Sequence, residues 1–189
     1  MVGVFPPYTT RLEYLLNKNG KGYRYNVINE GVSGECVFME MATRLPELLK
    51  KYKPNLVIIL GGTNDLHKLD CKDEVNVFYE LKSLHEMSHK LGSKTVAVTI
   101  PEADISDENL NVYDARTYRG IRKRVNSNLR DYAGRNVNTT LSDLAKKFPL
   151  LSLSAKEKKD LWCDGVHPSR KGYEKMADII YEDIKDFNF

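Results

Sequence analysis

The feature that most constrains the fold is an alternation of short β-branched runs with longer segments of helical period. The strand-like runs span residues 23–29, 55–62, 94–101 and 135–141. The helical segments span residues 9–19, 35–52, 73–91, 113–133 and 169–187. The second of these forms one helix or two, since Pro46 suits the first turn of a second helix. This order predicts a single α/β domain over residues 1–189, with a parallel sheet covered by helices on both faces.

Composition narrows the class of protein. Apolar residues make up 41% and charged residues 29%, which is typical of a globular chain rather than a disordered one. A net charge of +3, with cations interleaved among acids, gives no reason to expect a nucleic-acid partner. No run is apolar and long enough to span a membrane, and "MVGVFPPYTT" lacks the pattern of a secretory signal. Three cysteines without C-x-x-C spacing favour free thiols and a cytoplasmic location.

The stretch "LWCDGVHPSRKGY" places an acid and an imidazole three residues apart, just before the last predicted helix. The carboxylate of Asp164 could fix the tautomer of His167 and stabilise its imidazolium form, as in a general base that serves a nucleophile. As an alternative, a D-x-x-H pair simply caps the helix that follows it.

Two Gly-rich turns follow predicted strands, "NEGVSGE" at 29–35 and "GGTNDL" at 61–66. They lie at the carboxyl ends of parallel strands, where ligands bind in such sheets. Each taken singly also fits ordinary turn chemistry. Neither has the spacing of a dinucleotide or phosphate loop, so no cofactor is expected.

"HEMSH" at 85–89 has the form H-E-x-x-H, the signature of zinc peptidases, with His85 and His89 as ligands and Glu86 as base. The core stripe of this helix is predicted to run through Val77, Leu81, Leu84, Met87 and Leu91. It leaves His85 near its edge and His89 outside it. No third ligand follows downstream, so two surface histidines are expected and no metal site.

Taken in order, these motifs resemble those of the SGNH hydrolases, also called GDSL esterases and lipases. The resemblance covers nearly the whole chain and implies a flavodoxin-like three-layer α/β/α sandwich. "NEGVSGE" is similar to the Gly block, which implies that Gly34 donates to an oxyanion. "GGTND" is similar to the block that supplies a second donor, here Asn64. "DGVHPSRKGYEKMA" is similar to the last block, which implies that Asp164 and His167 belong to a catalytic triad.

The nucleophilic serine of that family lies in a G-D-S motif after the first strand, and this sequence has no G-D-S. "PPYTTRLEYLL" looks like the helix that follows the serine loop, so the first strand and its serine are expected upstream of Met1. In the family's strand order, 2-1-3-4-5, that strand lies inside the sheet. We expect none of Ser33, Cys163 and Ser169 to replace the serine, and we expect Ser169 to cap the last helix.

The resemblance implies a serine ester hydrolase acting on a small acyl or acetyl ester, with no metal or organic cofactor. A non-catalytic relative that keeps the cleft and binds a ligand is the alternative from another class. A zinc peptidase built on "HEMSH" ranks third. The sequence leaves the oligomeric state and the acyl group open.

Overall fold

The computed structural model describes residues 5–19, 22–67, 74–104 and 117–189. Two compact units make up the chain. The first unit comprises residues 1–31, 101–105 and 144–187, and the second comprises residues 32–100, 106–143 and 188–189. The expectation of a single domain over residues 1–189 stays a prediction.

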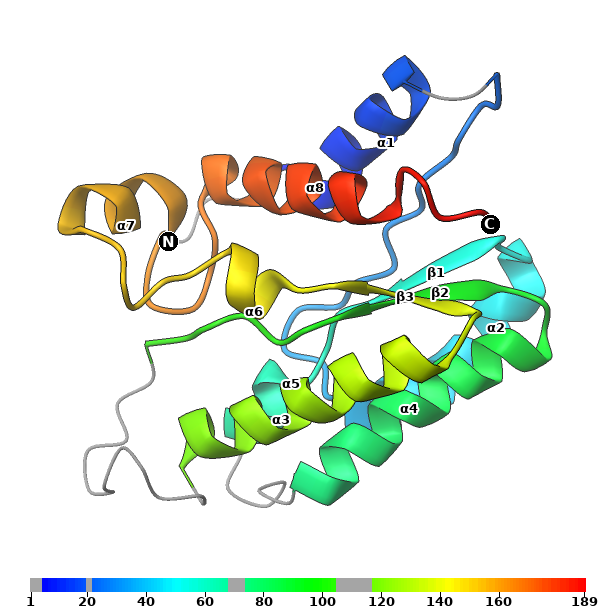
Figure 1. The fold of residues 1–189 in the computed structure, drawn as a ribbon, viewed down its shortest axis with the longest axis horizontal. Coiled ribbons are helices and arrows are strands. Elements are labelled where there is room, and N and C mark those ends of the chain that lie inside the picture. Colours follow the sequence, from blue (N-terminus) through cyan, green and yellow to red (C-terminus); the bar gives the residue numbers. More distant parts are fainter. Residues whose placement is uncertain (1–4, 20–21, 68–73, 105–116) are drawn as a thin grey trace. The chain divides into compact units, whose positions relative to one another are not determined.

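A parallel sheet forms the centre of the second unit (Figure 1). Its strands are β1 (Leu56–Ile59), β2 (Lys94–Val98) and β3 (Thr139–Ser142), in the spatial order β1-β2-β3. Around the sheet lie the π-helical turn η1 (Val37–Met41) and the helices α2 (Ala42–Tyr52), α3 (Thr63–His67), α4 (Glu74–Lys90) and α5 (Tyr118–Arg135). This arrangement confirms the predicted α/β class and the parallel sheet.

The central strand, β2, pairs with a strand along each edge, and the helices α4 and α5 pack against it. Its Val96 and Ala97 are completely buried, whereas most of β1 is half-buried. Just past β2, the Asn126 side chain on α5 accepts a hydrogen bond from the Ile100 N–H at 2.8 Å and donates to the Ile100 carbonyl at 2.9 Å. An amide thereby satisfies both backbone groups where the strand stops. These contacts fix the carboxyl end of β2.

The predicted strand at 23–29 is wrong, because Tyr23–Gly31 is extended without pairing in a sheet among the described residues. Its backbone bonds to side chains of α1 (Tyr8–Asn19) instead. The Asn17 side chain donates to the Tyr25 carbonyl and accepts from the Tyr25 N–H, both at 2.9 Å, and Glu13 accepts from the Val27 N–H at 2.7 Å. A β-branched run becomes a strand only where another strand supplies partners, and the described chain supplies none.

In the first unit, α1 packs against the last helix, α8 (Arg170–Ile184), and the short helices α6 (Leu144–Lys147) and α7 (Ala155–Leu161) also pack on α8. On α8, Met176, Ala177, Ile180 and Ile184 are buried, whereas Tyr173 is half-buried. Arg11 on α1 forms a two-pronged ion pair with Asp178 on α8, at 2.7 and 3.2 Å. Apolar packing and this pair join two helices that lie far apart in sequence.

Two helices, α2 and α5, begin at residues other than those predicted. Pro46 lies inside α2 rather than in a first turn, because the chain enters this helix through η1. The helix predicted at 113–133 begins at Tyr118, where the Thr117 side chain accepts from the Gly120 N–H. Residues 113–116 lie outside the described residues.

The burial of His85 corrects the prediction of two surface histidines. His85 is completely buried, and neither ring nitrogen has a hydrogen-bond partner within the described residues. Its ring lies 5.5 Å from that of Tyr132 on α5. Leu91, predicted for the core, is 54% exposed. The buried face of α4 is therefore rotated, relative to the prediction, toward α5, which packs against this helix (Figure 1).

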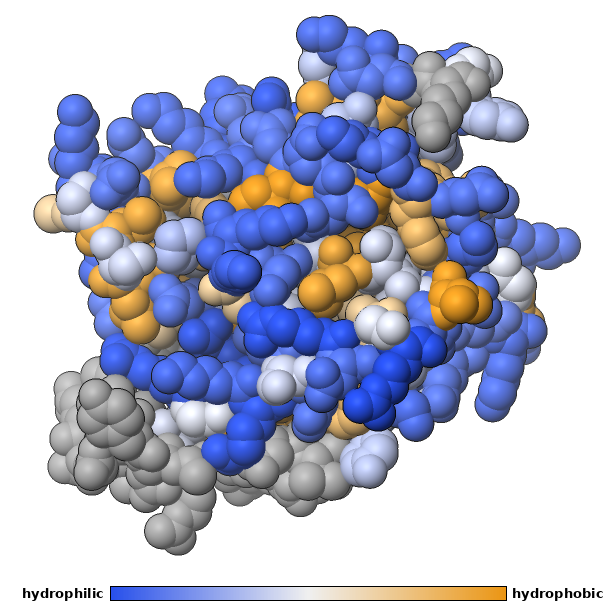
Figure 2. All heavy atoms as spheres, in the orientation of Figure 1, coloured by the Kyte–Doolittle hydropathy of each residue, from blue (hydrophilic) through white to orange (hydrophobic). Residues whose placement is uncertain are grey.

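No described helix has the length and apolar character needed to cross a bilayer. On the face drawn in Figure 2, hydrophilic side chains predominate and the apolar ones gather in separate areas.

Acid should destabilise this protein through His85. Burial, followed by the charge of nearby His89, lowers the pKa of His85 from 6.5 to about 3. Between these values the unfolded chain binds a proton that the folded chain does not. Stability should therefore decline as the pH falls from about 6.5 toward 3, at up to about 1.4 kcal/mol per pH unit.

Replacement of the imidazole, as in His85→Leu, should flatten this acid limb in urea unfolding curves measured from pH 7 to pH 4. The exposed His67 on α3 provides the matched control, and His67→Gln should keep the wild-type slope. A His85→Leu protein that loses stability with acid as steeply as the wild type would contradict the assignment.

Candidate active site

The loop that enters η1 contains the first predicted site residue, Gly34. Its φ of +79° lies in the region that suits glycine, so a side chain here would strain the backbone. The Gly34 N–H has no acceptor within the described part of the chain, whereas the next N–H, of Glu35, bonds to the Val32 carbonyl at 3.3 Å. Among the described residues, the Gly34 N–H is therefore available to donate to another acceptor.

Asn64, the second predicted donor, lies on α3 directly after β1 and the Gly61-Gly62 pair. Its Nδ2 donates to the Glu35 carbonyl at 2.8 Å, which places its side chain against the residue that follows Gly34. An amide nitrogen carries two hydrogens, so one remains for another acceptor. The structure thus brings together the two predicted oxyanion donors, within the second unit.

Asp65 is a site residue that the sequence analysis did not single out, although it is the last letter of "GGTND". Its side chain is only 1% exposed, and its two oxygens accept from the Val37 N–H at 3.0 Å and the Phe38 N–H at 3.1 Å. One carboxylate thereby satisfies two backbone donors of η1, one buried and one part-buried. Its adjacency to Asn64 in the motif was the available signal.

The two glycines before α3 let this motif approach the loop closely. A Cβ on Gly61 would lie 2.7 Å from the Val37 side chain, and one on Gly62, whose φ is +105°, would lie 2.6 Å from Ile100. Real Cβ atoms do not approach so closely. The motif "GGTND" therefore needs both glycines to hold Asn64 and Asp65 against η1.

Inside η1, Met39 has φ +64° and ψ −48°, a conformation that non-glycine residues rarely adopt. Such strain costs roughly 1–3 kcal/mol and persists only where surrounding contacts impose it. Those contacts are present: Asp65 holds the preceding backbone, Glu40 accepts from the Cys36 N–H at 2.5 Å, and Thr43 donates to the Met39 carbonyl.

The predicted acid and base lie together in the first unit. His167 Nδ1 is 2.9 Å from Asp164 Oδ2, while Asp164 Oδ1 accepts from the N–H groups of Val166 at 2.7 Å and His167 at 2.6 Å. About half of each side chain is exposed, with fractions of 43% for Asp164 and 55% for His167. The carboxylate holds one nitrogen of the ring, which leaves Nε2 to exchange a proton.

The pKa of Asp164 lies below its ordinary value. Partial burial alone raises it, but the hydrogen bonds from the backbone and ring of His167 and from the Val166 N–H outweigh that effect. The carboxylate is therefore charged at neutral pH, as a residue that orients an imidazole must be.

Contacts on both sides fix this turn. The Gly165 carbonyl accepts from the Asp104 N–H at 2.6 Å, and a Cβ at Gly165 would lie 2.7 Å from the Asp104 side chain. Trp162, stacked on Phe148 at 4.7 Å, makes an antiparallel bridge with Pro168. The side chain of Ser169 accepts from the Gly172 N–H at 3.2 Å, which confirms the predicted helix cap.

Ser169, Cys163 and Ser33, which are not expected to replace the serine, have different surroundings. Ser169 is occupied as a cap and also donates to the Asp160 carbonyl at 2.5 Å. The Cys163 thiol is exposed and lies 3.6 Å from the Pro168 carbonyl. Ser33 is exposed beside Gly34, in the second unit.

Glu86 and His89 of the zinc motif have different neighbours in the structure. Glu86 is exposed and pairs with Lys82 at 3.3 Å, while His89 Nε2 lies 3.0 Å from the Thr95 hydroxyl. Among the residues that the structure describes, no three His, Cys, Asp or Glu side chains are grouped to hold a metal ion.

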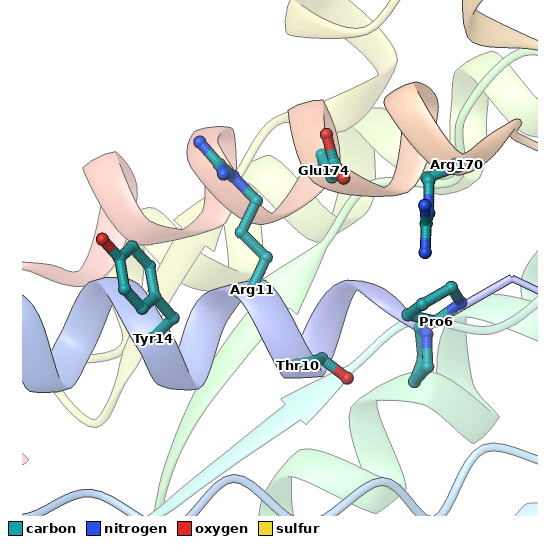
Figure 3. A pocket seen from close by; sticks show the side chains of 7 residues that line it. Pro6, Thr10, Arg11, Tyr14, Arg170 and Glu174 are labelled. Atoms are coloured by element: carbon teal, nitrogen blue, oxygen red, sulfur yellow. The ribbon is translucent and has the colours of Figure 1, made fainter.

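A groove of about 240 Å³ runs between α1 and α8 in the first unit (Figure 3). Its lining is Pro6, Pro7, Thr10, Arg11, Tyr14, Arg170 and Glu174. Arg11 is neutralised by Asp178, and Arg170 begins the helix that follows the Asp164–His167 turn. No residue of this groove was predicted as part of a site.

Loss of the Asp65 carboxylate should destabilise the η1 loop. Asp65→Asn keeps the shape but replaces an acceptor with a donor, so one buried N–H of η1 loses its partner. The free energy of unfolding should fall by about 1–3 kcal/mol, and the Val37 and Phe38 amides should exchange with deuterium faster. Asp131→Asn, at an exposed site on α5, is the control. Unchanged exchange at both amides would show that Asp65 does not hold the loop.

The sequence of this chain is similar to those of known esterases and lipases. The family model of the GDSL-like Lipase/Acylhydrolase family matches residues 2–175. A multidomain esterase from Ruminococcus flavefaciens is 26% identical over 189 residues, an alignment that takes in 90% of this chain. That alignment covers only 22% of the relative, so the chain spans about a fifth of that protein's length.

Solved structures share the fold. A catalytic mutant of an acetylxylan esterase from Geobacillus stearothermophilus superposes with a TM-score of 0.75 at 23% identity, covering 97% of this chain and 82% of that one. A GDSL-like lipase from Bacteroides thetaiotaomicron gives 0.71 at 21% identity, covering 94% and 82%. With a family model that matches nearly its whole length, the chain belongs to the GDSL-like lipase/acylhydrolase family.

Proposed function

We propose that this chain is the larger part of a serine ester hydrolase whose nucleophile lies upstream of Met1. The observation that carries the proposal is the Asp164–His167 pair, in which a charged carboxylate holds Nδ1 of an exposed imidazole. Such a pair activates a hydroxyl nucleophile. Family membership supports acyl transfer, and the relatives described as esterases support an ester substrate.

In the proposed reaction, the serine Oγ attacks the ester carbonyl while its proton passes to Nε2 of His167. Asp164 stabilises the imidazolium that results. His167 then gives the proton to the leaving alkoxide. In the second half of the reaction, His167 takes a proton from the water that attacks the acyl-enzyme and returns it to the serine Oγ as the carboxylic acid leaves.

The developing oxyanion would accept hydrogen bonds from the Gly34 N–H and from the second hydrogen of the Asn64 amide. Both donors have the availability that this role needs, since the first has no acceptor among the described residues and the second uses one hydrogen on Glu35. Fixed donors of this kind supply a large share of the rate in acyl transfer.

Residues 23–31 do not pair in a sheet among the described residues, and this agrees with an additional strand from upstream. In the family's strand order that strand lies beside this segment and carries the serine at its end. Its arrival would give the segment the neighbour that it needs to form a ladder.

The test is to express the chain together with upstream sequence that contains a G-D-S block and to measure hydrolysis of p-nitrophenyl acetate and butyrate. The extended protein should be active, and its serine should react with a fluorophosphonate, visible as added mass. The intact mass of the protein from its natural source decides whether such a segment exists. A natural mass of 21.7 kDa, that of this sequence, would refute the proposal and favour a ligand-binding relative without catalysis.

His167→Ala in the extended protein should lower kcat by roughly 10⁴–10⁶-fold, because the serine loses its base. The control is His67→Ala, which removes an exposed imidazole on α3. Full activity in the His167→Ala protein would eliminate this mechanism.

Asn64→Ala should lower kcat by roughly 10²–10³-fold with a smaller change in KM, because the amide acts mainly on the transition state. Asn128→Ala on α5 is the matched amide control. An equal fall in kcat in both variants would show that Asn64 does not stabilise the oxyanion.

A further inference from the structure

We propose that Phe38 and Met39 form an apolar contact for the acyl group of the substrate and favour esters of longer, apolar acids over acetates. The inference rests on the proposed function, because it takes Gly34 and Asn64 as the groups that receive the carbonyl oxygen. It concerns the second unit alone.

The first reason is that two adjoining large apolar side chains, Phe38 and Met39, are exposed to solvent. Phe38 is 50% exposed and Met39 is 66% exposed, and Val32, on the other side of Gly34, is also exposed. Large apolar side chains are ordinarily scattered singly over a surface, whereas adjoining ones mark a place where something binds.

The second reason is strain held by a dedicated set of contacts. Met39 keeps its φ of +64° because Asp65, Glu40 and Thr43 fix the backbone on both sides of it. A glycine would relieve the strain, and the methionine is left 66% exposed. Strained residues of this type concentrate at ligand sites, where the side chain is needed in one position.

The third reason is proximity to the carbonyl site. Asp65 holds the Phe38 N–H at 3.1 Å, and its chain neighbour Asn64 donates to the Glu35 carbonyl at 2.8 Å. The same rigid turn therefore carries the donor at Gly34 and the two apolar side chains. A carbonyl oxygen at these donors would leave the rest of the ester within reach of Phe38.

The chemistry of the two side chains selects the acyl group. A phenyl ring and a thioether provide apolar surface and no hydrogen-bond donor. Each additional methylene buried against them strengthens binding, whereas acetate has too few carbons to profit.

The experiment uses the chain as it is, with no serine required. Octanoate, which has the carboxylate of an ester product, is titrated into protein labelled with ¹³C at the methionine methyl groups. The Met39 methyl resonance should shift with octanoate and should not shift with acetate at the same concentration. No shift with octanoate, or equal shifts with both acids, would overturn the inference.

Variants separate binding from structure. Phe38→Ala should weaken octanoate binding about tenfold, whereas Tyr79→Ala, at an exposed aromatic on α4, should leave the affinity unchanged. Met39→Gly should raise the melting temperature, because strain is removed, and should weaken octanoate binding. A Met39→Gly protein with a lower melting temperature and unchanged affinity would make Met39 purely structural and refute the inference.

The outcomes distinguish this inference from the proposed function. Octanoate binding at Met39 together with an inactive extended protein would refute the esterase and leave the binding site standing. An active extended protein that binds no octanoate would refute the acyl contact and leave the esterase standing.

Discussion

Parallel pairing between β1, β2 and β3 is the constraint on which the second unit depends. The strands run in one direction, so their carboxyl ends meet at one edge of the sheet, and the chain must leave each strand there through a turn. The turn after β1 becomes α3, which carries Asn64 and Asp65. The same pairing rule explains residues 23–31, which have a strand's composition. Within the described part of the chain no strand adjoins them, and their backbone forms hydrogen bonds with Asn17 and Glu13.

In each unit, a carboxylate accepts hydrogen bonds from backbone N–H groups of the turn that contains predicted site residues. In the second unit, Asp65 holds two N–H groups of η1, and this fixes the loop that contains Gly34. In the first unit, Asp164 accepts two N–H groups of its own turn with one oxygen and His167 Nδ1 with the other. Each acid thus fixes the backbone of one loop, which explains why short motifs determine the conformation at these two places.

Much of this was predictable from local sequence, because local chemistry decides it. The spacing of Asp164 and His167 by three residues in a Gly-Pro turn is enough to bring the carboxylate to the ring, and Ser169 precedes its helix where a cap must lie. The strands at 55–62 and 94–101 were predicted from their β-branched residues and contain β1 and β2. The contacts of Asp65 were not predicted, because its partners lie 27 and 28 residues away in the chain.

The sequence by itself determined the strands β1 and β2, the turn that pairs Asp164 with His167 and the glycines that permit close approach. Each of these depends on residues within a few positions of one another. Only the tertiary structure decided that the run at 23–29 bonds to α1 side chains, that His85 is buried against α5, and that Met39 is held strained and exposed close to Gly34. Those outcomes depend on which distant segment supplies a hydrogen bond or a packing surface, and neither periodicity nor composition encodes that choice locally.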